Sequence, residues 1–385
     1  MKILHVCLAA FYIDNYSYQE NILPRMHKIL GYDVRILAST ETFVDDMNLG
    51  YTKPGEYYNE DGILVKRVDY SSILPRQVMK KLRIYKNFYN YIDDFKPDLI
   101  FLHDVQFLSI VSIMQYKKNN PSVKIVADGH ADFSNSARSF ISKNILHKCI
   151  YKEFIKLAEP YIDKFYGTLP ARVDFFKNVY SIPAEKVSFL PMGVDDLLAN
   201  RYNTLENRNL IRKKYNIKKE DFLIVTGGKI DLAKTQTLLL MKAVHGLGNN
   251  VKLLVFGSVA NELRVKFDKL CNEKIQYLGW ANVEESYQYL SAADLVIFPG
   301  RHSVYWEQTA GLGKAMIVKL WKGTTHVDLG GNVRFLKEDS VEEIKRNIEF
   351  LLDHPEEYKK MKQIAVEKGM KEFSYMDIAK RSIED

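Results

Sequence analysis

Two lysines next to a glycine turn are the first residues of this sequence whose types and spacing suggest chemistry. Gly228 and Lys229 follow the apolar run at residues 222–226, and Lys234 comes a few positions later. If the apolar run is a strand, both ammonium groups lie near its end, where they could hold a diphosphate and stabilise it as it departs. The segment matches neither GxxxxGK[ST] nor GxGxxG, and loop lysines are often simply solvated. The pair therefore needs a second feature beside it.

Residues 297–317 supply that second feature, because they read as strand, tight loop, helix start and next strand. Pro299 and Gly300 break the apolar run, Ser303 offers a hydroxyl that could cap the helix, and Glu307 follows just inside it. A helix start presents free N–H groups and the positive end of the helix dipole, and phosphate binds there readily. The alternative is an ordinary turn in which Glu307 only complements the dipole.

A histidine flanked by two carboxylates follows another apolar run. Residues 123–127 lead into Asp128, Gly129, His130 and Asp132. Two Asp and one His could be metal ligands or an acid/base group. Because no further His or Asp cluster has convincing ligand spacing, we expect a site without a metal, in which Asp128 or Asp132 orients His130.

The polar loop at residues 12–21 also follows a predicted strand. It contains Asn15, Tyr18 and Gln19, a hydrogen-bonding set that suits a polyhydroxylated ligand such as an acceptor. Loops are polar in any case, so a purely solvated loop is the alternative.

The elements that would position these residues alternate between strand and helix in both halves of the chain. This order predicts an α/β protein with two Rossmann-like doubly wound parallel-sheet domains facing a cleft, whose ligands lie beyond the carboxyl ends of the strands. Pro191 and Gly193, followed by the polar residues 196–220, mark a boundary. We expect domains at 1–195 and 196–372, with the amphipathic residues 373–385 crossing back to the first.

Composition limits the function classes. A chain of 385 residues with 46% hydrophobic content can bury two cores, and its three scattered cysteines suggest neither disulfides nor a zinc site. No run has the length of a signal peptide or membrane span, so we expect a cytoplasmic protein. The net charge of +7 is too modest to indicate nucleic acid.

Two basic stretches leave open whether the protein docks on an anionic membrane surface as a peripheral protein. The first is a predicted helix with an apolar face, and the second interleaves basic and apolar residues. The basic residues are Arg76, Lys80, Lys81, Arg83 and Lys86 in the first, and Lys143, His147, Lys148, Lys152 and Lys156 in the second; the apolar face of the first carries Val78, Leu82, Tyr85, Tyr89 and Ile92. Solvated faces of ordinary helices are the alternative.

Over nearly its whole length the chain resembles retaining GT-B glycosyltransferases of the large fourth family, which includes many bacterial saccharide-assembly enzymes. The family's G-R-L-x-x-x-K segment is matched by residues 228–234, with Lys229 in place of Arg, and its PxGVD segment by residues 191–195. The resemblance implies that Lys229 and Lys234 hold the diphosphate of a UDP- or GDP-sugar. It also implies that His130 lies near the transferred sugar.

Further motifs support the resemblance. Gly257 matches the family's strand-end glycine, Trp280 ends an LGW turn that lies beside the base, and Glu307 with Gln308 resembles the EQ version of the ribose-binding segment. The family's other Glu is replaced by Pro299, and the glycine pair of its first loop is absent. We therefore predict that the backbone N–H groups of residues 301–303, with the Ser303 hydroxyl, meet the distal phosphate or sugar. These residues are Arg301, His302 and Ser303.

The mechanism that the resemblance implies is front-face transfer with retention, which needs neither a metal nor another cofactor. The acceptor would be a saccharide or a lipid-linked saccharide in cell-surface polysaccharide assembly, bound by Asn15, Tyr18, Gln19 and Asp132. Two other functions stay open. A nucleotide-sugar epimerase can use the same fold, and the replacement at Pro299 would also suit a non-catalytic nucleotide-sugar-binding subunit.

Overall fold

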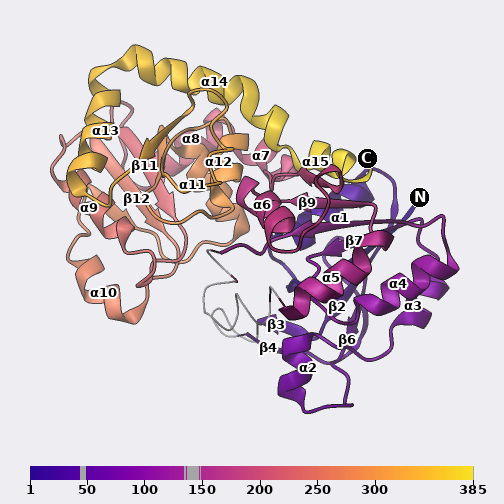
Figure 1. The fold of residues 1–385 in the computed structure, drawn as a ribbon. Coiled ribbons are helices and arrows are strands. Elements are labelled where there is room, and N and C mark those ends of the chain that lie inside the picture. Colours follow the sequence, from indigo (N-terminus) through magenta and orange to yellow (C-terminus); the bar gives the residue numbers. More distant parts are fainter. Residues whose placement is uncertain (44–48, 134–135, 137–146, 148, 385) are drawn as a thin grey trace. The chain divides into compact units, whose positions relative to one another are not determined.

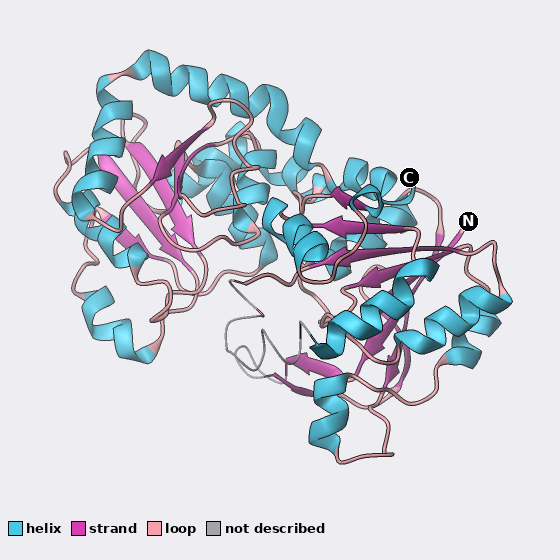
Figure 2. Cartoon of the chain, in the orientation of Figure 1, coloured by secondary structure: helices cyan, strands magenta, loops and turns pink. Residues whose placement is uncertain are grey.

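The computed structural model describes residues 1–43, 49–133, 136, 147 and 149–384. The chain divides into two compact units, one formed by Met1–Pro191 with Ile378–Asp385 and the other by Met192–Asp377. Each unit has a large sheet with helices packed around it (Figures 1 and 2). Within the described residues, no helix combines the length and the apolar character that a bilayer crossing needs.

The large sheet of the first unit has eight strands in the order β10-β9-β8-β7-β1-β2-β6-β5, and only the edge strand β5 runs antiparallel to its neighbour. Its strands are β1 (Lys2–Cys7), β2 (Asp33–Ser39), β5 (Gly55–Tyr58), β6 (Leu64–Val68), β7 (Leu99–His103), β8 (Lys124–Gly129), β9 (Lys164–Gly167) and β10 (Val187–Phe189). A separate antiparallel pair consists of β3 (Glu41–Phe43) and β4 (Leu49–Tyr51). The helices are α1 (Gln19–Ile29), α2 (Arg76–Leu82), α3 (Tyr89–Phe95), α4 (Ile110–Asn119), α5 (Lys152–Ala158) and α6 (Pro170–Asn178), with 3-10 turns at Glu159–Tyr161 and Ala184–Lys186.

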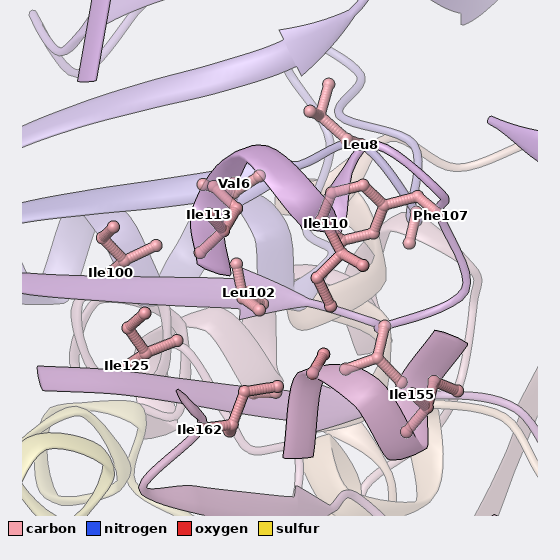
Figure 3. Packing of buried hydrophobic residues seen from close by; sticks show 14 of the residues in the cluster. Val6, Leu8, Ile100, Leu102, Phe107, Ile110, Ile113, Ile125, Ile155 and Ile162 are labelled. Atoms are coloured by element: carbon pink, nitrogen blue, oxygen red, sulfur yellow. The ribbon is translucent and has the colours of Figure 1, made fainter. Parts of the chain in front are cut away.

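Alternation along the central strands sorts apolar from polar side chains. Val6 of β1 and Leu102 of β7 belong to one core together with Ile110 of α4 and Ile155 of α5 (Figure 3). Because successive side chains of a strand point to opposite faces, His5 and His103 lie on the other face of the same sheet. Both are fully buried. Histidines buried on this face, next to apolar residues such as Phe101, need hydrogen-bond partners for their ring nitrogens.

The sheet of the second unit is fully parallel, with the strand order β13-β12-β11-β14-β15-β16. Its strands are β11 (Phe222–Gly227), β12 (Val251–Phe256), β13 (Ile275–Tyr277), β14 (Leu295–Phe298), β15 (Ala315–Lys319) and β16 (Val333–Leu336). The helices are α7 (Asp196–Tyr202), α8 (Leu205–Lys214), α9 (Gln236–His245), α10 (Asn261–Asp268), α11 (Val283–Ala292), α12 (Tyr305–Gly311), α13 (Val341–Asp353), α14 (Pro355–Phe373) and the start of α15 (Tyr375–Glu384).

This strand order reverses direction between β11 and β14, which is the Rossmann arrangement. Ligands of such sheets bind beyond the carboxyl ends of the two strands that flank the reversal. The predicted α/β class with two doubly wound parallel sheets is therefore confirmed. In the first unit, the corresponding reversal lies between β1 and β7.

The single helix predicted from the basic pattern at residues 76–92 is wrong. Helix α2 ends at Leu82, because Arg83 adopts a left-handed conformation (φ 51°), and α3 starts only at Tyr89. Tyr85 is buried between them, where its hydroxyl donates to the carbonyl of Leu8 at 2.6 Å. In the second basic stretch, Lys143 and Lys148 lie outside the described residues.

Candidate functional site

Two glycines bring the ends of β11 and β12 together. Gly228 (φ 116°) and Gly257 (φ 117°) both have backbone conformations that favour glycine. A Cβ atom on Gly257 would lie 2.0 Å from the carbonyl oxygen of Gly228, so no other residue fits there without a backbone shift. The turn that results leaves a backbone corner next to Lys229.

Three cations gather beyond the carboxyl ends of β11 and β14. Burial lowers the pKa of Lys234, the Asp231 carboxylate raises it, and the charges of Arg301 and Lys229 lower it again. The loops are in contact, since a Cβ atom on Gly300 would lie 4.0 Å from Cβ of Lys234. Lys229 is largely exposed, with its ammonium 3.7 Å from Asp231. A bound polyanion would relieve the repulsion among the three side chains.

Glu307 of α12 is fully buried and held by two histidines. Its Oε1 accepts hydrogen bonds from Nε2 of His302 at 2.7 Å and of His326 at 2.8 Å. Burial raises the pKa of Glu307, but the two imidazoles outweigh this and lower it to about 2. Oε2 has no hydrogen-bond partner. An ionised carboxylate with one oxygen fixed and one available can accept from a ligand hydroxyl.

The predicted Ser303 helix cap is wrong. The residue before α12 is Val304, and its side chain makes no capping hydrogen bond, whereas Ser303 contributes only its carbonyl to the N–H of Trp306 at 3.0 Å. The chain therefore enters α12 one residue later than predicted. Trp280 follows β13 and is 57% exposed. It is next to Gly279, whose carbonyl accepts from the N–H of Gly257 at 2.7 Å.

In the first unit, Asp128 at the end of β8 organises the site. Its Oδ1 lies 3.3 Å from Nε2 of His130, and its Oδ2 accepts from Nδ1 of His103 at 2.9 Å and from Gln19 at 3.0 Å. The N–H of Asp104 donates to Oδ1 at 3.0 Å. Burial raises the pKa of Asp128, but the two histidines lower it more strongly. Asp128 is thus an ionised, fully buried carboxylate.

The structure separates the predicted acceptor residues into two groups. Gln19 is buried and donates to Asp128, and Asp132 accepts from Nε of Arg172 at 3.3 Å, so both help to build the site. Asn15 (φ 62°) donates its N–H to Glu60 at 3.1 Å, and Tyr18 is 40% exposed. Of the two carboxylates considered for orienting His130, Asp128 makes the contact.

Among the described residues, two groups bring three potential metal ligands within 4.8 Å of one another. They are Glu20 with His103 and His130, and His302 with Glu307 and His326. In each group the imidazoles already have carboxylate partners, Asp128 in the first and Glu307 in the second. Hydrogen bonds and the ion pair of His130 with Asp128 thus give the imidazoles partners in both groups, and the expectation of a metal-independent site stays a prediction.

Some site residues gave no signal in the sequence. His326 follows Glu307 by 19 positions, and His5 and His103 occur inside apolar strands, where a buried histidine is indistinguishable from an ordinary core residue. Arg301 was predicted to offer its backbone, yet its side-chain charge acts on Lys234. The strand order places β11 beside β14, and this explains why the two loops that follow them meet.

Comparison with known proteins shows the fold. No family model and no curated protein sequence matches the chain. Sucrose-phosphate synthase from Thermosynechococcus elongatus is 13% identical with a TM-score of 0.69, and the match covers 99% of this chain and 96% of that one. HepE from Anabaena, solved in complex with UDP-glucose, is 15% identical with a TM-score of 0.67 and coverage of 100% and 98%. UDP-GlcNAc 2-epimerase from Neisseria meningitidis, bound to UDP-GlcNAc, is 13% identical with a TM-score of 0.61 and coverage of 100% and 99%. The chain thus has the two-domain GT-B fold that its sequence predicts.

Proposed function

We propose that this protein is a retaining glycosyltransferase that moves a hexose or N-acetylhexosamine from a UDP- or GDP-sugar to a saccharide or lipid-linked saccharide. The observation that carries the proposal is the group of three cations, Lys229, Lys234 and Arg301, at the strand reversal of the second unit. A diphosphate bound there offsets the repulsion among the three cations, and the attraction counts for more than in water because Lys234 is partly desolvated.

The donor contacts follow from the same loops. We assign the diphosphate to Lys229, Lys234 and Arg301, next to the turn formed by Gly228 and Gly257. Oε2 of Glu307 accepts from the ribose hydroxyls, while His302 holds the other oxygen. The further donor-site assignments are Trp280 beside the base and the backbone of Ser303 near the distal phosphate or sugar.

The proposed mechanism is front-face transfer. The bond between the sugar's anomeric carbon and the diphosphate oxygen breaks, and the acceptor hydroxyl forms its new bond on the same face. The departing phosphate oxygen takes the proton of that hydroxyl, so no protein nucleophile is needed. Lys229 and Lys234 stabilise the charge that develops on the diphosphate, and this is why the proposal is metal-independent. His130, as an imidazolium, donates to the sugar or its phosphate.

The name and ligand of a structural neighbour support the choice of donor. HepE was solved with UDP-glucose, which has the diphosphate and ribose that our site assignment requires. The epimerase remains the second candidate, because its fold is similar and it binds UDP-GlcNAc. We assign Asn15, Tyr18, Gln19 and Asp132 to the acceptor side of the first unit, with Gln19 acting through Asp128.

We also propose that the protein works in the cytoplasm and docks on an anionic membrane, where lipid-linked acceptors of cell-surface polysaccharides are found. Ile73 and Leu74 are exposed directly before α2, and Arg76 and Lys81 are exposed on it. Apolar side chains that enter the headgroup region, next to cations that meet anionic lipids, are typical of peripheral binding.

The test uses the full-length chain with a panel of UDP- and GDP-sugars. A cognate donor should raise the midpoint of thermal unfolding, because it binds the folded state. With an acceptor extract and EDTA present, UDP or GDP should be released and the product should keep the donor's anomeric configuration. Interconversion of the sugar without transfer would indicate the epimerase. Tight binding without release or transfer would indicate a non-catalytic subunit.

A further inference from the structure

A continuous path of buried hydrogen bonds connects the last turns of α15 to Asp128. The path has four steps. Nε2 of His27 lies 3.1 Å from Oγ of Ser382, Nδ1 of His27 lies 3.0 Å from Nε2 of His5, Nδ1 of His5 lies 2.9 Å from Nε2 of His103, and Nδ1 of His103 lies 2.9 Å from Asp128. We call His27, His5 and His103 the histidine chain. All members, with Ser382 and Asp128, have 0% exposure.

The bonds of the histidine chain constrain one another. A neutral imidazole has one donor and one acceptor nitrogen, and Asp128, being ionised, can only accept. Nδ1 of His103 must therefore donate, so its Nε2 accepts from His5, and His5 in turn accepts from His27. Nε2 of His27 is then left as an acceptor. The donor and acceptor roles in every hydrogen bond of the histidine chain thus depend on the group that contacts Nε2 of His27.

Two groups of α15 compete for that nitrogen. The Ser382 hydroxyl can donate to it, whereas the carbonyl of Ala379, at 3.0 Å, can only accept. If His27 carries a proton on Nε2 and donates to Ala379, every bond between the rings reverses. His103 must then hold two protons to keep its bond to Asp128, which places a buried imidazolium beside that carboxylate. The two states differ by one proton.

Burial favours the state without the extra charge. It lowers the pKa of His5 well below its usual value and, with a weaker contribution from His103, lowers that of His27 to about 4, although the Ala379 carbonyl acts in the opposite direction. The Ser382 hydroxyl is consequently needed to satisfy His27 in the neutral chain. An alternative partner for that hydroxyl is close, since Oγ of Ser382 also lies 2.8 Å from the Ala379 carbonyl.

We propose that the histidine chain positions His130: it transmits the orientation of the Ser382 hydroxyl to Asp128, and so determines how strongly Asp128 holds the His130 imidazolium. The step from Asp128 to His130 is direct, at 3.3 Å. Glu20 raises and Arg172 lowers the pKa of His130 as well, so the chain modulates a charge that several groups set. Only the link from His130 to the donor sugar rests on the proposed function.

The test measures histidine protonation directly, by nitrogen NMR of the full-length protein labelled at histidine. In the wild type, His27 should carry its proton on Nδ1. Ser382→Ala should move that proton to Nε2, and the new imidazolium at His103 should increase the acid ionisation constant of His130 by about threefold. Ser382→Thr keeps the hydroxyl and should change neither value.

A substitution in the middle of the histidine chain shows whether the effect of Ser382 on His130 is transmitted through these hydrogen bonds. In the His5→Phe background, which keeps a ring stacked on Phe101, Ser382→Ala should leave His130 unchanged. An unchanged His27 proton in Ser382→Ala would overturn the proposal, as would a His130 shift that persists in the double variant. If His5→Phe fails to fold, the comparison of Ala with Thr at residue 382 still decides.

The NMR result needs no substrate, so it separates this proposal from the proposed function. With a cognate donor, the basic limb of the pH profile of kcat should move to lower pH in Ser382→Ala by the same threefold in ionisation constant, and not in Ser382→Thr. If no donor gives transfer but the His27 proton moves as expected, the proposed function is wrong and the proposal on the histidine chain stands. A transfer rate that falls without movement of the limb would indicate a merely structural role.

Discussion

The buried carboxylate of Asp128 lies 3.3 Å from the imidazole of His130, and it sets the charge of that ring. Burial alone would lower the pKa of His130, but Asp128 raises it to about 9. The carboxylate is fully buried, whereas the side chain of His130 is 21% exposed. His130 therefore carries a positive charge at neutral pH, and the carboxylate that stabilises this charge is fully buried.

Replacing Asp128 by Asn should remove this charge at neutral pH. Without the carboxylate, burial holds the pKa of His130 at or below its ordinary 6.5. In the pH profile of kcat, the midpoint of the decrease at high pH should move from about 9 to about 6.5 or lower. At pH 8, kcat should therefore fall at least about tenfold. The measurement is the pH profile of kcat.

The matched control is Asp132→Asn, which removes a carboxylate bound to Arg172 and should leave the limb in place. Stability gives a second readout. Because the folded-state pKa of His130 is raised, its contribution is fully present below pH 6.5 and is lost as the pH rises through about 9. Asp128→Asn should abolish that dependence. A limb that stays near pH 9 in this variant would contradict the assignment.

Lys234→Ala should weaken donor binding. Lys234 is a half-buried member of the cation group, and a charged hydrogen bond in such a site contributes about 1.5–3 kcal/mol, which corresponds to roughly tenfold to a hundredfold in affinity. Calorimetry with UDP and with uridine should show that the loss occurs for the diphosphate only. Lys242→Ala, at an exposed position of α9, is the control. Equal affinity of wild type and Lys234→Ala for UDP would place the diphosphate elsewhere.

The sequence predicted the elements that local pattern determines. Strands such as β11 and β14 are short apolar runs ended by glycine or proline, and this pattern predicts both the strands and where they end. The pattern failed at Arg83, whose left-handed backbone conformation ends α2, and at Ser303, because Val304 and not Ser303 precedes α12. Where a helix ends or begins depends on the tertiary contacts of the residues beside it. Tyr85, which is buried between α2 and α3, is an example.

The partners of the site residues could not be predicted, because they are distant in the sequence. Gln19 donates a hydrogen bond to Asp128, 109 positions later, and the sequence gives no indication of this contact. His27 and Ser382, 355 positions apart, meet only after the last helix packs on the first unit. Composition and periodicity contain no information on such pairs. The fold was therefore predictable, and the network of hydrogen bonds among these distant side chains was not.

Glu307→Gln should reduce recognition of the ribose. The variant keeps the shape of the side chain but loses the charge that the two histidines stabilise. If Oε2 accepts from the ribose, the wild type should prefer UDP over 2′-deoxy-UDP by about tenfold, and the variant should lose most of this preference. Competition binding with the two nucleotides measures it. His326→Gln, which removes one holder of Glu307, should cause a smaller loss. A preference that survives in Glu307→Gln would rule out the contact.

Gly257→Ala should destabilise the second unit more than Gly279→Ala does. Both glycines have positive φ, which costs other residues about 1–3 kcal/mol. Only at Gly257 would the new Cβ also meet a backbone atom, the oxygen of Gly228 at 2.0 Å, whereas nothing lies within 4 Å at Gly279. The difference in free energy of unfolding, from urea titration, should be about 1–3 kcal/mol. An equal loss of unfolding free energy in both variants would mean that the turn formed by Gly228 and Gly257 shifts without cost to accommodate the new Cβ atom.

Membrane docking should depend on the exposed apolar residues before α2 and on the exposed cations of α2 itself. Ile73 is 83% exposed and Lys81 is exposed on the helix, so one can enter the headgroup region while the other meets anionic lipid. Each cation near such a surface contributes about 1 kcal/mol, so Lys81→Glu should lower binding to phosphatidylserine vesicles by roughly tenfold or more. Ile73→Ser should lower it independently of salt. Lys213→Glu, at an exposed position of α8 in the second unit, is the control for net charge. If Lys213→Glu weakens sedimentation with vesicles as much as Lys81→Glu does, the attraction belongs to the whole protein and not to this surface.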